Sequence, residues 1–200
     1  MSLISELYKL QRKDIKKAAN VLANAFYDDP IYNKMDMGED KRRIISELMI
    51  RFSFRYGNLV STSENLEGVM AITPHDKPMT FLRIIRSGAF FISMKLASLR
   101  KMMGAVEKAM EEEKKNLNID PYIYLFTIGV SREFQGKGFG GKLLRAIVEK
   151  ADTERKPMYL ETQNEKNVSL YEKYGFYVTK KIDLPEPLNL PMWLMVRDAK

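Results

Sequence analysis

A glycine-rich segment at residues 135–141 has the composition of a loop that binds phosphate groups. Glycines allow the backbone to approach an anion closely, and a helix that begins in such a segment presents free N–H groups to it. Three basic residues, Arg132, Lys137 and Lys142, lie in or beside the segment, against the single acid Glu133. The first chemistry that the sequence suggests is therefore the binding of a phosphorylated ligand, and three interpretations compete for it.

The first interpretation is a Walker A loop. Gly136 and the pair Gly141-Lys142 have the required spacing. Leu143, however, stands where a Ser or Thr must hold Mg²⁺, so this interpretation fails.

The second interpretation is a dinucleotide-binding fingerprint. Gly136, Gly138 and Gly141 match the G-x-G-x-x-G pattern, and Glu161 lies 20 residues further on, where a ribose-binding acid belongs. That fingerprint opens directly at the end of a strand, whereas Val130 lies several residues before the first glycine. The segment also falls in the last third of the chain, which leaves no room for the remaining βαβ units.

The elements that must position this loop follow from the apolar pattern. An apolar, β-branched run at 122–130 predicts a central strand ahead of the loop. After the loop, the pattern predicts a helix at 142–152, a strand at 158–162, a short helix at 167–174 and strands at 177–179 and 192–196. Before the central strand, it predicts a strand at 7–10, helices at 15–26 and 41–56, a hairpin of strands at 59–62 and 69–72, and mostly helix from 81 to 117. The order predicts a single α/β or α+β domain over residues 1–200 with a mixed sheet.

Composition excludes several classes of site. The chain has 200 residues, a net charge of +7, no Cys and one His, His75. Disulfides, thiolate metal sites, a cysteine nucleophile and a multi-histidine metal site are therefore excluded, and no metal is predicted. No apolar run approaches the ~20 residues that span a bilayer. No basic stripe interleaved with aromatic residues is present, so a nucleic-acid partner is poorly supported despite the positive charge. These features favour a cytoplasmic protein with no membrane and no nucleic-acid partner, and the charge run at 111–115 reads as a solvated helix face.

The third interpretation carries a family resemblance. Gln135-x-x-Gly138-x-Gly140, placed between a strand and a helix, resembles the loop that binds the acetyl-CoA pyrophosphate in the GNAT superfamily of N-acetyltransferases. Residues 167–176 are similar to the closing motif of that superfamily, an Asn followed by Leu-Tyr-x-x-x-Gly-Phe. Further similarity, at 126–131, 160–162 and 170–173, and at an Ala-Asn-Ala-Phe helix leading into Asp28-Asp29-Pro30, is to the branch that contains puromycin N-acetyltransferase.

The resemblance implies a fold and a cofactor site. The fold is a mixed, mostly antiparallel sheet flanked by helices. The segment around 80–117 lies outside the resemblance, and we expect it to be a helical insertion that shapes the acceptor pocket. The co-substrate is acetyl-CoA, and the strand ending near Val130 splays from its neighbour. The residues implied to hold acetyl-CoA are Ile128 and Val130 through backbone groups, the loop residues Gln135, Gly136, Lys137, Gly138, Phe139 and Gly140, and the amides of Asn164 and Asn167. For the two asparagines, turn formation and helix capping are the alternative.

The resemblance also assigns catalytic candidates. Tyr171 is the candidate general acid, because a phenol with a pKa near 10 stays protonated at pH 7 and can protonate the thiolate that leaves. Its alternative role is that of a core tyrosine. The candidate general base comes from the strand pattern instead: Glu161 alternates with Tyr159 on one strand face, and an ordinary strand-end carboxylate is the alternative. Asp28 and Asp29 either attract a cationic acceptor or simply end a helix.

The implied function is direct transfer of an acetyl group from acetyl-CoA to a primary amine. The absence of cysteine agrees with a mechanism that forms no acetyl-thiol intermediate on the enzyme. The resemblance favours a small-molecule acceptor, and the alternatives are a protein or peptide amino group, or a non-catalytic module that only binds CoA. The oligomeric state is left open as a monomer or a homodimer.

Overall fold

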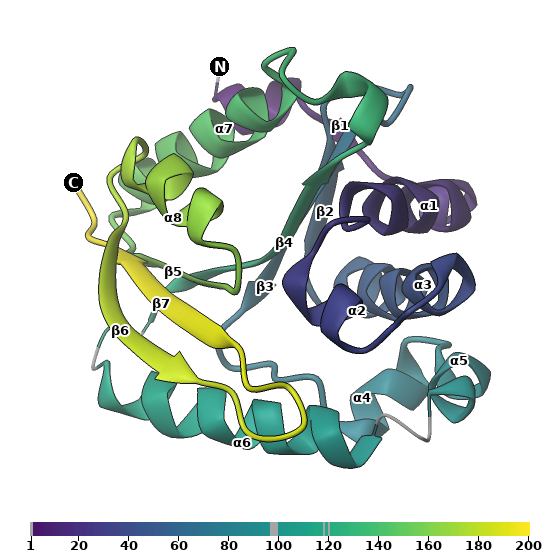
Figure 1. Ribbon diagram of the computed structural model, residues 1–200. Helices are drawn as coiled ribbons and strands as arrows, with labels where there is room; N and C mark the ends of the chain where they lie inside the picture. Colours follow the sequence, from purple (N-terminus) through teal and green to yellow (C-terminus); the bar gives the residue numbers. More distant parts are fainter. Residues whose placement is uncertain (1, 97–99, 118, 120) are drawn as a thin grey trace.

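The computed structural model describes residues 2–96, 100–117, 119 and 121–200, and these residues form a seven-stranded sheet with helices on both faces (Figure 1). The strands are β1 (Tyr8–Lys9), β2 (Asn58–Ser61), β3 (Gly68–Pro74), β4 (Ile123–Val130), β5 (Met158–Thr162), β6 (Tyr177–Asp183) and β7 (Pro191–Arg197). The α-helices are α1 (Ile15–Ala25), α2 (Pro30–Lys34), α3 (Glu39–Tyr56), α4 (Phe81–Arg86), α5 (Phe90–Lys95), α6 (Arg100–Asn116), α7 (Phe139–Glu154) and α8 (Glu165–Glu172).

The strand order is β1-β2-β3-β4-β5-β7-β6. Every neighbouring pair is antiparallel except β4 and β5, which are parallel because α7 crosses over between them. The prediction of a mixed, mostly antiparallel sheet flanked by helices is confirmed. The predicted strands and helices lie where the apolar pattern placed them, with boundaries that differ by a few residues.

The sheet opens between β4 and β5. The two strands pair only at Ile123 with Met158 and at Tyr124 with Tyr159. Beyond Tyr124, β4 continues along β3 as far as Val130, while β5 continues along β7. The second half of β4 therefore has no strand partner on its β5 side among the residues that the structure describes. We call this opening the β4–β5 split.

Helices α1 and α3 cover one face of the sheet and α7 covers the other (Figure 1). On the first face, Leu22 of α1 packs in the same core as residues of β2 and β3. A Cβ at Gly129 would lie 2.8 Å from the Cβ of Ala25, so glycine permits the close approach of α1 to β4. On the second face, Leu143 and Ile147 of α7 are fully buried against β3, β4 and β5.

The described residues between 81 and 117 are mostly helical, as predicted, and form α4, α5 and α6. Gly88 separates α4 from α5 with a φ of +76°, a left-handed conformation that a continuous α-helix does not contain. The longest piece, α6, runs beside β6 and β7 at the lower edge of Figure 1, and Val106 packs there against a core that includes Tyr159. The prediction that the charge run faces solvent is wrong for Lys114, whose side chain is only 12% exposed.

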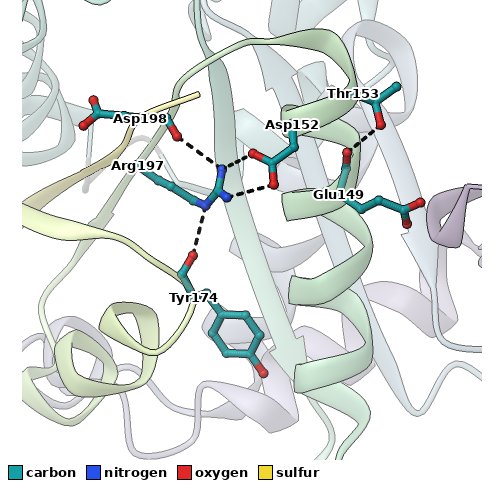
Figure 2. A network of polar contacts seen from close by, with 6 residues as sticks. All are labelled: Glu149, Asp152, Thr153, Tyr174, Arg197 and Asp198. Atoms are coloured by element: carbon teal, nitrogen blue, oxygen red, sulfur yellow. Dashed lines mark hydrogen bonds and ion pairs between the residues drawn. The ribbon is translucent and has the colours of Figure 1, made fainter. Parts of the chain in front are cut away.

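A buried arginine ties β7 to α7 and to the turn after α8 (Figure 2). The guanidinium of Arg197, which is 2% exposed, donates to both carboxylate oxygens of Asp152 at 2.7 and 2.9 Å. It also donates to the backbone carbonyls of Tyr174 at 3.0 Å and Asp198 at 3.3 Å. The hydrogen bonds from Arg197 hold the pKa of the Asp152 carboxyl below its usual value. Because Tyr174 lies two residues after the end of α8, this network helps to fix the helix that carries Tyr171.

Candidate functional site: a cavity at the split in the sheet

A cavity of about 860 Å³ lies at the β4–β5 split and is lined by residues of α2 to α6, β4, β5 and α8. Four of the predicted site residues line it, namely Ile128, Glu161, Asn167 and Tyr171. Val130, Asn164 and the glycine-rich loop do not line it; the loop begins five residues after the carboxyl end of β4. The structure thus brings the two catalytic candidates into one cavity and places the anion-binding candidates next to the strand that borders it.

The backbone of β4 presents hydrogen-bonding groups to the split. The N–H of Ser131 donates to the carbonyl of Glu67. Ser131 and Glu67 therefore form a hydrogen-bonded pair of the antiparallel strands. Because hydrogen-bonded and non-hydrogen-bonded pairs alternate, Val130 and Ile128 form non-hydrogen-bonded pairs with β3. Their N–H groups therefore point away from β3 and toward β5, where no strand is paired with them. The register thus supports the prediction for Ile128 and Val130, which rested only on the family resemblance.

The glycine-rich loop leads into α7 with its helix N-terminus exposed. Gly136 and Gly138 adopt left-handed conformations, with φ of +75° and +86°, and Gly138 is the N-cap of α7. The N–H of Lys142 donates to the carbonyl of Gly138, and it is the first N–H of α7 to take part in the hydrogen bonding of the helix. The N–H groups of residues 139–141 are therefore left for an external acceptor. The side chain of Gln135 donates to the carbonyl of Val130 at 3.0 Å and closes the loop against β4.

Asn24 holds the start of the loop, and sequence reasoning assigned it no role. Its side-chain oxygen accepts hydrogen bonds from the N–H of Arg132 at 2.7 Å and from the hydroxyl of Ser131 at 3.0 Å. Asn24 lies on α1, more than 100 residues away in sequence, so no local pattern could have identified this contact.

Tyr171 lies on α8 with its ring 7% exposed and packed edge-on against Phe176, at 5.9 Å between centroids. Its hydroxyl makes no hydrogen bond with any residue that the structure describes, and its side chain lines the cavity. Burial raises the pKa of Tyr171 to about 12, so the phenol keeps its proton throughout the neutral range. A buried phenol without a partner, facing a cavity, is free to donate to a ligand.

Glu161 is held in a buried polar cluster with Lys114 and Tyr124. Its Oε2 accepts a hydrogen bond from the Tyr124 hydroxyl at 2.6 Å, and its Oε1 lies 3.2 Å from Nζ of Lys114. The ammonium of Lys114 also lies 4.3 Å from the centroid of the Tyr124 ring. Burial, and next the charge of Glu161, raise the pKa of Tyr124 and of the neighbouring Tyr159 well above the usual value. The cavity therefore contains a carboxylate with a lysine as its counter-ion, and Lys114 is a site residue that the sequence analysis missed.

The asparagines and aspartates divide between capping and lining the cavity. Asn164 caps α8, with its side chain accepting from the N–H of Lys166 at 3.1 Å. Asn167 lines the cavity, with Nδ2 at 3.5 Å from Oγ1 of Thr162. Asp29 both caps α2, accepting from the Ile31 N–H at 3.0 Å, and lines the cavity, and burial raises its pKa. Asp28 is exposed.

The donor set fits a coenzyme with a phosphate-containing arm and offers no metal cluster. The free N–H groups at the start of α7, the nearby Lys137 and the unpaired β4 backbone match an anionic group followed by an amide-bearing chain. Within the part of the chain that the structure describes, no group of three or more His, Cys, Asp or Glu residues could hold a metal ion. None of the helices in that part combines the length and the apolar character needed to cross a bilayer.

The comparison with known proteins matches the part of the chain that forms the β4–β5 split and the glycine-rich loop. The model of the acetyltransferase (GNAT) family matches residues 90–176, which include β4, the glycine-rich loop, α7, β5 and α8. An uncharacterized N-acetyltransferase of Schizosaccharomyces pombe is 28% identical over 204 residues, which cover 96% of this chain and 83% of that protein. A probable serine/threonine-protein kinase of Dictyostelium discoideum is 26% identical over 208 residues, which cover 90% of this chain but only 22% of the kinase.

The fold is also found in solved structures. A crystal structure described as histone acetyltransferase HPA2 and related acetyltransferase, from Corynebacterium glutamicum, superimposes with a TM-score of 0.65 at 20% identity. The match covers 97% of this chain and 96% of the bacterial one. At this identity the comparison establishes a shared fold, including the flanked, mostly antiparallel sheet.

Proposed function

We propose that the chain is an acetyltransferase of the GNAT family, which is supported by the family match over residues 90–176 and by the similarity to the Schizosaccharomyces pombe N-acetyltransferase, and that it transfers an acetyl group from acetyl-CoA directly to the primary amine of a small molecule. The observation that carries the proposal is the position of the free Tyr171 hydroxyl in the cavity at the β4–β5 split. The motifs that resemble the puromycin N-acetyltransferase branch, together with a cavity lined by α2 to α6, support a small molecule over a protein chain as the acceptor.

The loop and β4 hold the co-substrate in this proposal. Acetyl-CoA supplies the acetyl group as an activated thioester. The backbone N–H groups of residues 136–140, with the positive end of α7 and Lys137, bind the pyrophosphate. The outward-facing backbone groups of Ile128 and Val130 pair with the pantetheine arm, and Asn167 donates to it from α8. The N–H of Val130 stabilises negative charge on the acetyl oxygen, a contribution of about 3 kcal/mol for comparable donors.

Two side chains handle the protons. Tyr171 donates a hydrogen bond to the sulfur as the bond to the acetyl carbon breaks, and the CoA thiolate takes up, through solvent, the second proton that the nitrogen loses as the amide forms. Glu161 accepts the proton of the acceptor ammonium through a water molecule in the cavity, because its two oxygens already contact Tyr124 and Lys114. No protein nucleophile is required, in keeping with a chain that has no cysteine.

The proposal is tested by comparing the thermal stability of the purified protein with acetyl-CoA, CoA, NAD and ATP. A ligand that binds only the folded state, at 100 times its Kd, adds about 2.7 kcal/mol to the free energy of unfolding. We expect stabilisation by acetyl-CoA and CoA but not by NAD or ATP, and release of free thiol from acetyl-CoA when a panel of primary amines is added. Stabilisation by NAD, or by none of the four, would refute the assignment of the loop.

A further inference from the structure

The cavity is polar at the sheet and mainly apolar at its other end. Glu161, Lys114 and Thr127 line it at the sheet, and Lys77 and Thr80 add polar groups in the loop before α4. The wall opposite is built from α3, α4 and α5, and the side chains that these helices contribute are almost all hydrocarbon or aromatic: Ile45, Met49, Phe52, Ile84, Phe90 and Met94. A ligand that fills the cavity from the β4–β5 split outward therefore meets polar groups first and apolar ones afterwards.

The apolar end opens to the surface at α4 and α5. Phe81, Phe90 and Met94 line the cavity and yet are 45%, 37% and 58% exposed. Apolar side chains that are both cavity walls and solvent-exposed mark the mouth of the cavity. Such a mouth is typical of a site whose ligand covers it when bound.

The acids of the cavity already have partners. Asp29 caps α2, and Glu161 faces Lys114 and Tyr124. Glu111 lies 3.9 Å from the same Lys114. Of the cavity acids in the described residues, none is left without a donor or a counter-ion. Among the described residues, the lining carries three acids, Asp29, Glu111 and Glu161, against two lysines, Lys77 and Lys114, so its net charge can balance one ammonium group, and a second would have to lie against the apolar wall.

We infer that the acceptor is a lipophilic monoamine: a molecule with one primary amine and an apolar body of alkyl or aromatic character. The amine lies at the β4–β5 split and the body extends along α3, α4 and α5 to the mouth at Phe90. This inference rests on the proposed function for the identity of the reacting group, but the chemistry of the body follows from the cavity wall. A volume of about 860 Å³ is near the upper end of ligand sites, so a small polar amine would leave the apolar wall in contact with water.

The test measures affinity without turnover. Binding of butylamine, hexylamine and octylamine to the protein is measured by calorimetry in the presence of CoA, which cannot acetylate them. Each buried methylene is expected to raise the affinity about fourfold, so octylamine should bind about 200-fold more tightly than butylamine. Octane-1,8-diamine, with the same length and a second charge, is expected to bind no more tightly than butylamine. Affinities that do not depend on chain length, or a diamine that binds as tightly as octylamine, would overturn the inference.

A matched pair of neighbouring residues serves as the control. Phe90 lines the cavity, whereas Phe91 is 77% exposed and does not. Phe90→Ser should reduce the ratio of octylamine to butylamine affinity by about fourfold or more, and Phe91→Ser should leave it within twofold. Equal effects of the two variants would show that alkyl chains bind at the outer surface rather than in the cavity, and would also overturn the inference.

Failure of the two proposals can be told apart. If the protein does not bind CoA but binds alkylamines with the expected chain-length dependence in its absence, the proposed function fails and the lipophilic site stands. If acetyl-CoA is consumed with small polar amines and alkyl chains add no affinity, the acetyltransferase function stands and the lipophilic acceptor fails.

Discussion

Replacing Tyr171 with phenylalanine removes one hydroxyl that the fold does not require. The ring remains packed against Phe176, and the lost oxygen has no hydrogen-bond partner among the described residues. We therefore expect Tyr171→Phe to change the free energy of unfolding by less than about 0.5 kcal/mol, and acetyl-CoA affinity by less than twofold, because no protein group is left unsatisfied. The turnover number should fall.

The size of the fall follows from the pKa of Tyr171. Burial raises it to about 12, whereas an ordinary thiol has a pKa of about 8.5. Full transfer of the proton from this phenol to the thiolate is uphill by about 3.5 pKa units, or about 5 kcal/mol. The phenol therefore acts mainly as a hydrogen-bond donor to the developing negative charge, which contributes about 1.5–3 kcal/mol. Each 1.4 kcal/mol is a factor of ten, so kcat should fall about tenfold to 150-fold.

The assay follows thiol release from acetyl-CoA with a saturating amine, between pH 6 and pH 10. Tyr177→Phe is the matched control, because Tyr177 is exposed and its hydroxyl contacts Asp198, away from the cavity. Since the pKa of Tyr171 is raised, its ionisation should add no alkaline decline to the wild-type profile below about pH 10. A Tyr171→Phe enzyme with kcat within threefold of wild type would refute the assignment of Tyr171 as the donor to sulfur.

Three further substitutions probe the supports of the site. Glu161→Gln removes the closer counter-ion of the buried Lys114 ammonium and leaves only Glu111, at 3.9 Å, so it should lower the free energy of unfolding in urea by up to about 3 kcal/mol; adding Lys114→Met should restore stability but not activity. Gly129→Ala places a Cβ 2.8 Å from Ala25 of α1 and should lower the free energy of unfolding, measured by thermal denaturation, by about 1–3 kcal/mol. Gly140→Ala, whose Cβ would have its nearest contact at 3.6 Å, should leave that free energy unchanged, and equal losses in the two variants would contradict the packing argument. Asp152→Asn should destabilise the protein at pH 7. The pKa of Asp152 is lower in the folded state than in the unfolded state, so its carboxylate contributes fully to the free energy of unfolding above the unfolded pKa near 4. That contribution disappears as the pH falls below about 4. The difference between variant and wild type in urea unfolding should therefore shrink below about pH 4, and a constant difference would contradict the role of the ion pair.

The fold was predictable where a local pattern determines it. The β-branched apolar run at 122–130 predicted a central strand, and the glycines at 136 and 138 predicted a turn before a helix, because both signals are local. The strand β4 is fully buried on one face and partly exposed on the other. The break between α4 and α5 was not predictable in the same way. Gly88 is one glycine in a helical pattern, and only its left-handed conformation in the folded chain separates α4 from α5.

The site was predictable in its motifs but not in its supports. Tyr171 and the loop lie in short segments whose spacing is visible in the sequence. Lys114 and Asn24 act on residues 47 and more than 100 positions away, through contacts that exist only after α6 and α1 have packed on the sheet. A run of Glu and Lys on a helix predicts a solvent-exposed face, because the sequence does not show how the helix is oriented on the sheet. Tertiary packing alone determines that Lys114 faces Glu161.

The most important feature of the site is a backbone geometry rather than a side chain. The N–H groups of Ile128 and Val130 face the β4–β5 split because β4 keeps its register with β3 while β5 follows β7. Any side chain of suitable size at these two positions would leave the same N–H groups in place. Substitution of the side chains should therefore affect co-substrate binding little, whereas a proline at Val130, which removes the N–H, should abolish transfer. The cavity wall formed by α3, α4 and α5 has the opposite character: its chemistry lies entirely in side chains, so acceptor choice can change by substitution while the acetyl-transfer site stays the same.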